Sequence, residues 1–324
     1  MYSNKNKKGK MKKLILLASF ALIQGCAPTS YIVKTPTPSN ITYIDAEKVA
    51  SKALVVKDNR AEGEKVFSSG ILSAELKIGK APIEPISYLK KNIELELLGR
   101  GIPVNIESGE ALDIDVDKLY IKNHRLNGFS PFVTFTYLKA AIVHDNVKTP
   151  VGIFIRRGKV PVWSFDEIVE PTLNEPLSLL VKELTAKVNA TVYKQSISDA
   201  DVETLIAKLK SNVKKGSSYL DVYQLGFGNN PSAIPFLKEL TSSDDEYKRQ
   251  AAISSLGILK AVDELELLKS LYANGKSWSD KAMSLKAIGD LGTKKGLDFL
   301  REEQKAIVND SKKYWVNDLI NLYL

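Results

Sequence analysis

Residues 222–300 contain one pattern three times. The pairs Leu225-Gly226, Leu256-Gly257 and Ile288-Gly289 follow one another at intervals of 31 and 32 residues. Each pair has an apolar residue three positions before it and two more at nine and twelve positions after its first member. These residues are Val222, Ile253 and Leu285, then Ile234, Leu265 and Leu297, then Leu237, Leu268 and Leu300. Agreement at four positions in three copies indicates a structural repeat in which each unit buries its apolar side against the next.

Each copy is expected to fold as two helices joined by a turn that contains the glycine, because this small residue lets the chain leave one helix and lets the next helix pack closely. The Asp244-Asp245 and Ser279-Asp280 pairs precede apolar runs and predict the N-termini of two of these helices. The aromatic residues Tyr219 and Trp278 either lie on a partner-binding surface or pack in the core.

The pattern resembles the short HEAT-like repeats. This resemblance implies an all-α solenoid over residues 199–324 that binds envelope protein partners, and an ordinary helical bundle is the alternative. This region has 18 basic and 18 acidic residues. It therefore lacks the excess of positive charge that a nucleic-acid-binding solenoid needs.

The N-terminal 25 residues are expected to form a signal peptide. Lys12 and Lys13 precede an apolar run of ten residues, Leu14 to Ile23. As a helix, a run of this length spans about 15 Å, half of what a bilayer core requires. The segment therefore fits the apolar core of a signal peptide rather than a membrane-spanning helix.

The residues that follow, Leu22-Ile23-Gln24-Gly25-Cys26, resemble the lipobox of bacterial lipoproteins. The resemblance implies signal cleavage between Gly25 and Cys26, and acylation of Cys26 with fatty acids such as palmitate. Because Ala27 rather than an aspartate follows the cysteine, the resemblance further implies the inner leaflet of the outer membrane, facing the periplasm. The alternative is an incidental cysteine beside an ordinary cleavage site. The proline-containing stretch 26–40 is expected to be a solvated, lipidated tether.

Residues 41–197 predict an α+β domain with two helices packed on a largely antiparallel sheet. Spacings of three and four residues between apolar positions indicate helices at 85–98 and 176–193. Apolar runs and alternation indicate strands at 52–56, 65–80, 112–116, 132–143, 151–155 and 160–163. Arg157-Gly158-Lys159 is expected to form the turn before the last strand.

Together with the lipobox and the closing helix at 176–193, three of these segments carry a second resemblance. The strand that ends in Asp58-Asn59-Arg60, the helix that ends in Leu97-Leu98-Gly99-Arg100-Gly101-Ile102, and the alternating strand Leu112 to Val116 resemble YajG-like and transport-auxiliary lipoproteins of the Gram-negative envelope. The resemblance implies a binding or assembly role and no enzymatic site.

Charge and motif content argue against nucleic-acid binding and catalysis. Of the 46 basic residues, six are lysines in the first 25 positions, which leaves 40 basic against 38 acidic residues in the remainder. A body this balanced does not attract phosphates. The sequence contains no nucleophile-elbow, phosphate-loop or dinucleotide-binding motif.

The titratable residues of the first domain are expected to be structural. Asp113, Asp115, Asp117 and Asp145 are interpreted as a solvated acidic face, and His124 and His144 as surface or sheet-edge residues. Asp58 and Arg60 are interpreted as a local ion pair. Cys26 is the sole cysteine, so disulfides and thiolate metal sites are excluded. No catalytic residue, cofactor or metal is therefore predicted.

These patterns predict a non-enzymatic envelope lipoprotein that serves as a protein-binding or assembly scaffold through its repeats. The alternative is an auxiliary lipoprotein of a lipid or solute transport system whose α+β domain binds a hydrophobic ligand.

Overall fold

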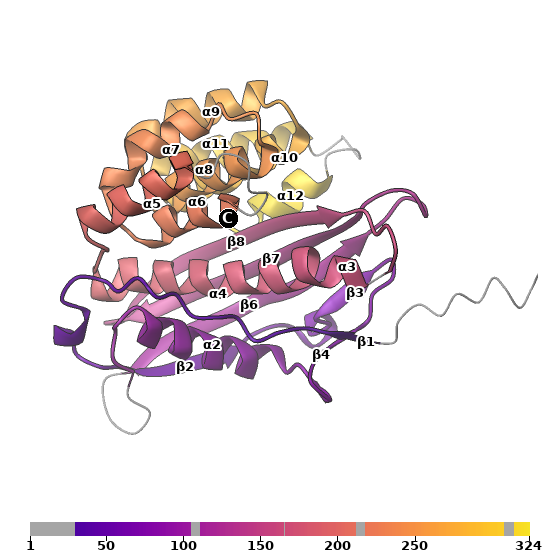
Figure 1. The fold of residues 1–324 in the computed structure, drawn as a ribbon, viewed down its shortest axis with the longest axis horizontal. Coiled ribbons are helices and arrows are strands. Elements are labelled where there is room, and N and C mark those ends of the chain that lie inside the picture. The colour runs from indigo at the N-terminus through magenta and orange to yellow at the C-terminus, as the bar shows by residue number, and fades with distance from the viewer. Residues whose placement is uncertain (1–29, 105–110, 165, 212–217, 308–313) are drawn as a thin grey trace, which may run out of the picture.

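The structure is a computed structural model that describes residues 30–104, 111–164, 166–211, 218–307 and 314–324 (Figure 1). The predicted signal peptide, the predicted cleavage site and Cys26 lie outside the described residues. The predicted architecture is confirmed, because a sheet domain with helices is followed by an all-helical region.

The main sheet is mixed. Its strands are β2 (Ala53–Asp58), β3 (Ser68–Gly70), β6 (Ala111–His124), β7 (Phe132–His144) and β8 (Val147–Lys159). Strands β6, β7 and β8 are antiparallel, whereas β2 and β3 both pair with β6 in parallel. The expectation of a largely antiparallel sheet is wrong for β2 and β3. The segment between these strands and β6 includes helix α2 (Pro85–Gly99). It carries the chain back to the end of the sheet where β2 starts, so that β6 runs parallel to β2 and β3.

The long hairpin turns at a different place from the one predicted. The β7–β8 turn is formed by Asp145 and Asn146, whose φ angles are 51° and 60°. Two consecutive positive φ angles are typical of a tight hairpin turn, and Asp and Asn tolerate them better than most residues. The expected turn at 157–159 instead lies within β8 and pairs with residues 132–134 of β7. Residues 160–163 do not form the expected strand.

The segment before the sheet domain packs against it. Strand β1 (Ser30–Ile32) pairs with β4 (Glu75–Ile78), which also pairs with β5 (Ala81–Pro82). Tyr31 and Val33 are buried, and the Ser39 backbone N–H donates to the Glu96 carboxylate at 2.8 Å. The expectation of a solvated tether is therefore wrong from residue 30 onward, because its apolar side chains find partners on the domain.

Two helices cover one face of the sheet. Helix α2 ends as predicted, and the second predicted helix appears as α4 (Glu175–Val188) with a π-helical turn at Asn189–Tyr193. A short helix, α3 (Asp166–Val169), precedes α4 along the same face. The alternating residues Leu112, Ile114 and Val116 of β6 are fully buried, whereas the residues between them are partly exposed. The predicted half-buried strand is thus confirmed.

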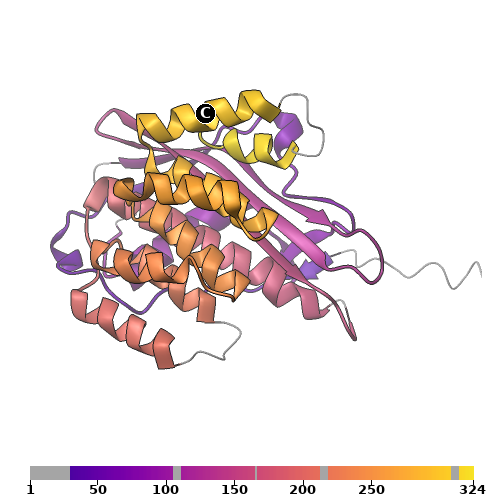
Figure 2. The same cartoon turned by 90° about the horizontal axis from the view of Figure 1, so that it is seen from above.

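The C-terminal region is a stack of helices. It comprises α5 (Asp199–Ser211), α6 (Ser218–Phe227), α7 (Ile234–Leu240), α8 (Glu246–Ile258), α9 (Leu265–Asn274), α10 (Trp278–Leu291), α11 (Lys294–Ile307) and α12 (Tyr314–Ile320). Helices α6, α8 and α10 form an inner row, because α8 packs between α6 and α10 and contacts both. Helices α7, α9 and α11 form an outer row (Figures 1 and 2).

The stack covers the second face of the sheet at β7 and β8. Phe135 of β7 contacts the Trp278 ring at 5.8 Å, and the Tyr323 hydroxyl donates to the Gly152 carbonyl at 3.3 Å. Residues 151–155 of β8 are consequently buried on both faces. One continuous hydrophobic core includes residues from both regions, from Leu54 to Leu322.

Candidate functional site: the helical repeats and their junction with the sheet

The repeat glycines lie inside helices of the inner row, not in turns. A Cβ on Gly226 would lie 3.0 Å from the Ser255 Cα of the next inner helix, and one on Gly257 would lie 2.6 Å from the Ala287 Cα. A Cβ on the third glycine, Gly289, would lie 2.5 Å from the Tyr323 ring. The expectation of glycine in the helix-ending turns is therefore wrong. Glycine recurs here because adjacent inner helices approach too closely for any side chain.

Ten of the twelve apolar positions in the repeat pattern are buried, whereas Ile234 and Leu297 are partly buried. Of the predicted set, the fully buried members are Val222, Leu225, Leu237, Ile253, Leu256, Leu268, Leu285, Ile288 and Leu300. They lie in both rows, so they hold each outer helix to its inner helix. The repeat pattern therefore predicted the core of the stack correctly.

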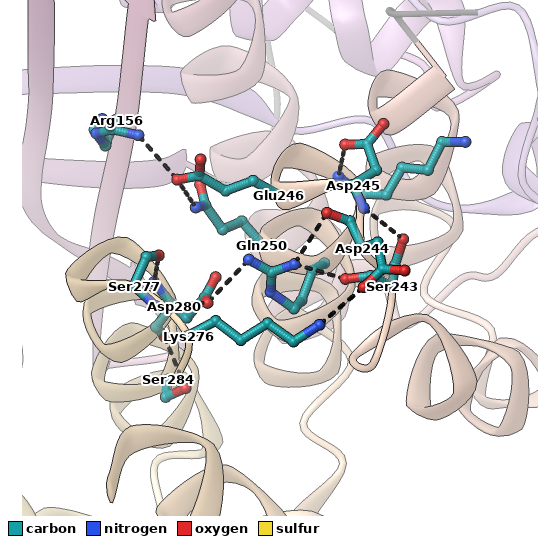
Figure 3. A network of polar contacts seen from close by, with 12 residues as sticks. Arg156, Ser243, Asp244, Asp245, Glu246, Gln250, Lys276, Ser277, Asp280 and Ser284 are labelled. Atoms are coloured by element: carbon teal, nitrogen blue, oxygen red, sulfur yellow. Dashed lines mark hydrogen bonds and ion pairs between the residues drawn. The ribbon is translucent and has the colours of Figure 1, made fainter. Parts of the chain in front are cut away.

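Polar side chains link the helix N-termini of successive repeats (Figure 3). Asp245 caps α8 as predicted, by accepting from the Lys248 N–H at 3.0 Å. Helix α10 begins earlier than predicted, because Ser277 is its N-cap and forms a capping box with Asp280. The Asp280 carboxylate also lies 3.0 Å from Arg249 of α8, and both side chains are buried. This ion pair joins two repeats and fixes their register.

A buried charged cluster connects the stack to the sheet domain. We name Glu183, Lys187, Lys286 and Asp290 the junction cluster. Lys286 Nζ of α10 lies 2.6 Å from Glu183 of α4, 2.7 Å from Asp290 and 2.8 Å from the Ser254 hydroxyl. Lys187 of α4 lies 2.7 Å from Glu183 and 2.6 Å from Asp290. The cluster holds two positive and two negative groups and is electrically balanced.

The pKa values in the cluster reflect these contacts. Burial opposes the charge of Lys286, but Asp290 and Glu183 outweigh it and raise the pKa of Lys286 well above its usual range. Burial likewise opposes ionisation of Asp290, but Lys187 and Lys286 lower the pKa of Asp290 below its usual value. Lys286 and Asp290 therefore remain charged in the core at neutral pH.

A second buried cation lies where the edge of β8 meets the stack. The Arg157 guanidinium lies 4.6 Å from the ring centroid of Tyr219, 5.2 Å from that of Tyr247 and 5.8 Å from that of Tyr223. Glu175 of α4 lies 3.8 Å from Arg157 and also accepts from the Tyr219 hydroxyl. Cation–π contacts of this kind stabilise a desolvated guanidinium. Tyr219 is therefore a buried junction residue, whereas Trp278 remains 39% exposed.

These contacts show which side of the repeats is free. The inner row packs against α4, β7 and β8 of the same chain. The outer row presents charged and polar side chains of both signs. Exposed members are Lys238, Glu239, Glu266, Ser270, Lys294, Lys295, Arg301 and Glu302. A partner that binds the folded protein through its repeats must therefore contact the outer row or the loops between helices.

The titratable residues of the sheet domain form ion pairs. Arg60 is buried and lies 2.8 Å from Asp58, so the predicted local pair is confirmed. Hydrogen bonding to Arg60 lowers the pKa of Asp58 from its usual value of 3.8. On the open part of the second sheet face, Lys57 pairs with Asp113.

The remaining candidates are dispersed in the same way. Lys148 lies 3.2 Å from Asp115, and His144 lies 3.3 Å from Asp145 at the hairpin turn. His124 is the last residue of β6, at the end of the sheet. Across the described ranges, no three His, Cys, Asp or Glu side chains gather in a way that suits a metal ion.

A cavity of about 200 Å³ lies at the seam between the two regions. Thr149, Pro150 and Val151 line it from β8, and Gly289, Leu291 and Leu297 line it from the stack. Its volume is below the 300–1,000 Å³ that is usual for pockets holding small organic ligands. The cavity therefore gives no support to binding of a hydrophobic ligand.

Among the described helices, none is long and apolar enough to cross a membrane. The structure is similar to a solved crystal structure of an uncharacterized protein, with a TM-score of 0.31 and 10% identity, over 50% of this chain and 99% of the other. A comparison with curated proteins gave no significant match. Residues 222–289 match the family model of HEAT repeats. The all-helical C-terminal region therefore contains a segment that matches HEAT repeats.

Proposed function

We propose that this protein is a non-enzymatic lipoprotein of the bacterial envelope that binds a protein partner through the outer row of its HEAT repeats. The observation that carries the proposal is that the repeats have one covered side and one exposed side. The inner row is covered by the chain's own sheet domain, whereas α7, α9 and α11 remain exposed beside one another. Stacked repeats generally use such extended surfaces for recognition.

The chemistry of the outer row favours a protein partner. Its exposed charges are of both signs, and the region from residue 199 onward has equal numbers of basic and acidic residues. A surface of this kind selects a partner by complementary charge patterns. Nucleic acid would instead require a continuous basic strip.

The envelope location rests on the lipobox-like segment that ends in Gly25-Cys26. In this proposal Cys26 is the acylated N-terminus of the mature protein, in the outer membrane and facing the periplasm. We also propose that the sheet domain is related to YajG-like and transport-auxiliary lipoproteins. Two or three acyl chains suffice for stable anchoring.

Site-specific photo-crosslinking in cells tests the partner surface. A photoreactive amino acid replaces Glu266, whose side chain on α9 is 81% exposed and whose pairing with Lys269 is a surface pair of little energetic value. Lys91, an exposed residue of α2 on the sheet domain, is the matched control position. We expect a discrete crosslinked product from position 266 and none from position 91. Charge reversal of Lys238 and Lys295 should reduce the yield of the product crosslinked from position 266. Equal products from both positions, or none from 266, would refute outer-row binding.

Fractionation tests the anchor. We expect the mature protein to float with outer membranes, and its N-terminal peptide to carry fatty acyl chains by mass spectrometry. Cys26→Ser should abolish acylation. A soluble, unmodified mature protein would refute the lipoprotein part of the proposal and leave the outer-row binding to be judged by crosslinking.

A further inference from the structure

Two loops at one end of the main sheet present apolar side chains to solvent. Phe129 and Leu126 in the β6–β7 loop are 95% and 79% exposed. Trp163 and Val162, which follow β8, are 91% and 66% exposed. Burial of large side chains is the main source of folding stability, so fully exposed aromatic residues in two neighbouring loops call for an explanation by contact with something outside the chain.

Strand pairing places the two loops side by side. Phe132, just after the first loop, pairs with Lys159, just before the second. Pro131 also approaches Gly158 closely, since a Cβ on that glycine would lie 4.0 Å from the Pro131 Cβ. In Figure 1 this is the right-hand end of the sheet, where α3 and β3 also lie. The four apolar residues therefore belong to one end of the molecule, which we call the apolar end.

Both loops satisfy much of their backbone hydrogen bonding internally. In the first loop, the Asn127 side chain accepts from the Phe129 and Ser130 N–H groups at 2.9 and 3.0 Å, and the Ser130 hydroxyl accepts from the Leu126 and Asn127 N–H groups at 3.0 and 2.9 Å.

In the second loop, the Glu167 carboxylate accepts from the N–H groups of Val162, Trp163 and Ser164 at 2.9, 2.8 and 3.2 Å. Paired amides matter because an unpaired backbone group costs several kcal/mol in an apolar phase. The loops thus offer apolar side chains on backbones that are already satisfied.

The chain enters the folded body at this same end. Tyr31 of β1 contacts Phe132 with 6.5 Å between ring centroids. Cys26 precedes Ser30 by four residues. Four residues span at most about 14 Å when fully extended. An acyl chain on Cys26 therefore holds a bilayer within about 14 Å of Ser30, next to the apolar end, because Tyr31 and Val33 are already packed on the domain.

We infer that the apolar end is a membrane-contact surface, with Phe129 and Trp163 inserted at the interface of a phospholipid bilayer. The inference rests on the proposed acylation of Cys26, which brings that bilayer within reach. Segments 125–131 and 159–164 contain no acidic residue, and Arg125 and Lys159 lie at their bases. Aromatic side chains above basic residues match the order of acyl chains and phosphates at a bilayer surface. The contact orients the molecule, whereas acylation alone would leave it free to rotate.

Tryptophan fluorescence of the full acylated protein tests the inference. The protein is reconstituted into vesicles of phosphatidylethanolamine and phosphatidylglycerol, with or without a phospholipid brominated on its acyl chains. Trp163→Phe identifies the Trp163 signal against Trp278 and Trp315. Phe129→Ser removes the neighbouring anchor. The matched control moves the tryptophan to the far end of the same strand, with Trp163→Phe combined with Val147→Trp. Val147 is 62% exposed, and a thirteen-residue strand separates the two ends by about 40 Å.

We expect bromolipid to quench the Trp163 signal at least twofold, with an emission shift to shorter wavelength, and to leave the tryptophan at position 147 unaffected. Phe129→Ser should reduce the quenching. Acylated protein whose Trp163 is not quenched, or is quenched no more than the tryptophan at 147, overturns the inference and leaves the anchor intact. Mass spectrometry of the same sample shows whether Cys26 is acylated. Unacylated protein whose Trp163 is still quenched refutes the anchor and supports the membrane-contact surface.

Discussion

Replacing Lys286 with methionine removes one charge from the junction cluster without leaving a large void, because the two side chains have similar length. Lys286 is fully buried and contacts two carboxylates at 2.6 and 2.7 Å. In the variant, Glu183 and Asp290 share only Lys187, so the core gains one uncompensated negative charge. Removing one partner of a buried ion pair costs about 3–5 kcal/mol. This is a large share of the roughly 5–15 kcal/mol by which most proteins are stable.

We therefore expect the free energy of unfolding of Lys286→Met to fall by about 3–5 kcal/mol, which corresponds to a melting temperature lower by roughly 10 °C. Urea denaturation followed by circular dichroism measures it. The double variant Lys286→Met with Glu183→Met restores charge balance and should recover much of the loss. Lys281→Met, at a partly exposed position on the same helix, should change stability by about 0.5 kcal/mol or less.

The pH dependence provides the sharper test. In the native protein the pKa of Asp290 is lowered, so its stabilisation is present above the usual value of 3.8 and is lost as pH falls toward the folded value. In Lys286→Met the surplus carboxylate is disfavoured when charged, so its folded pKa rises and acidification relieves the penalty. The stability deficit should therefore shrink from about pH 7 to about pH 5. A deficit below about 1 kcal/mol at neutral pH, or one that grows on acidification, would refute the balanced-cluster argument.

Three further predictions follow from the same contacts. Gly257→Ala should destabilise the protein by about 1–3 kcal/mol, because the new Cβ meets the backbone of the next inner helix, whereas Gly63→Ala meets nothing within 4 Å and should be neutral in a thermal melt. Removal of residues 199–324 should yield a sheet domain that binds hydrophobic dyes and lacks a cooperative transition, since the second face of β7 and β8 loses its cover; a sharp calorimetric transition would contradict the shared core. Asp58→Asn should lower the urea midpoint at neutral pH, and the difference from the native protein should shrink only as pH falls below 3.8, because the lowered pKa of Asp58 keeps its pairing with Arg60 stabilising down to the folded value.

The sequence was sufficient to predict the parts of the fold that depend on periodic apolar residues. The repeat positions around Leu225 and Leu256, helix α2 and the alternating strand β6 all follow from spacing within one segment. The glycines show the limit of this reasoning. Gly226 and Gly257 have the same local pattern whether they end a helix or admit a neighbouring one, and only the position of Ser255 and Ala287 in space distinguishes the two.

The junction could not be predicted for a similar reason. Lys286 and Glu183 are more than 100 residues apart and look like ordinary solvent-facing charges on two amphipathic helices. Arg157 was assigned to a turn because Gly158 follows it, yet both lie in β8. The signal for the true turn was Asp145-Asn146, two residues that tolerate positive φ, between two runs of β-forming residues.

The double burial of β7 and β8 also dictates when the protein finishes folding. Lys139 donates to the carbonyls of Asn321 and Leu324, which lie 182 and 185 positions later in the chain. The Tyr323 hydroxyl donates to the carbonyl of Gly152, 171 positions earlier. During synthesis, the hairpin is therefore complete long before the helices that cover its second face have emerged. Contacts this distant in sequence form slowly, and the uncovered apolar strands are prone to aggregation in the meantime. The hairpin therefore acquires its protection from aggregation only when α10 and α12 have emerged and docked.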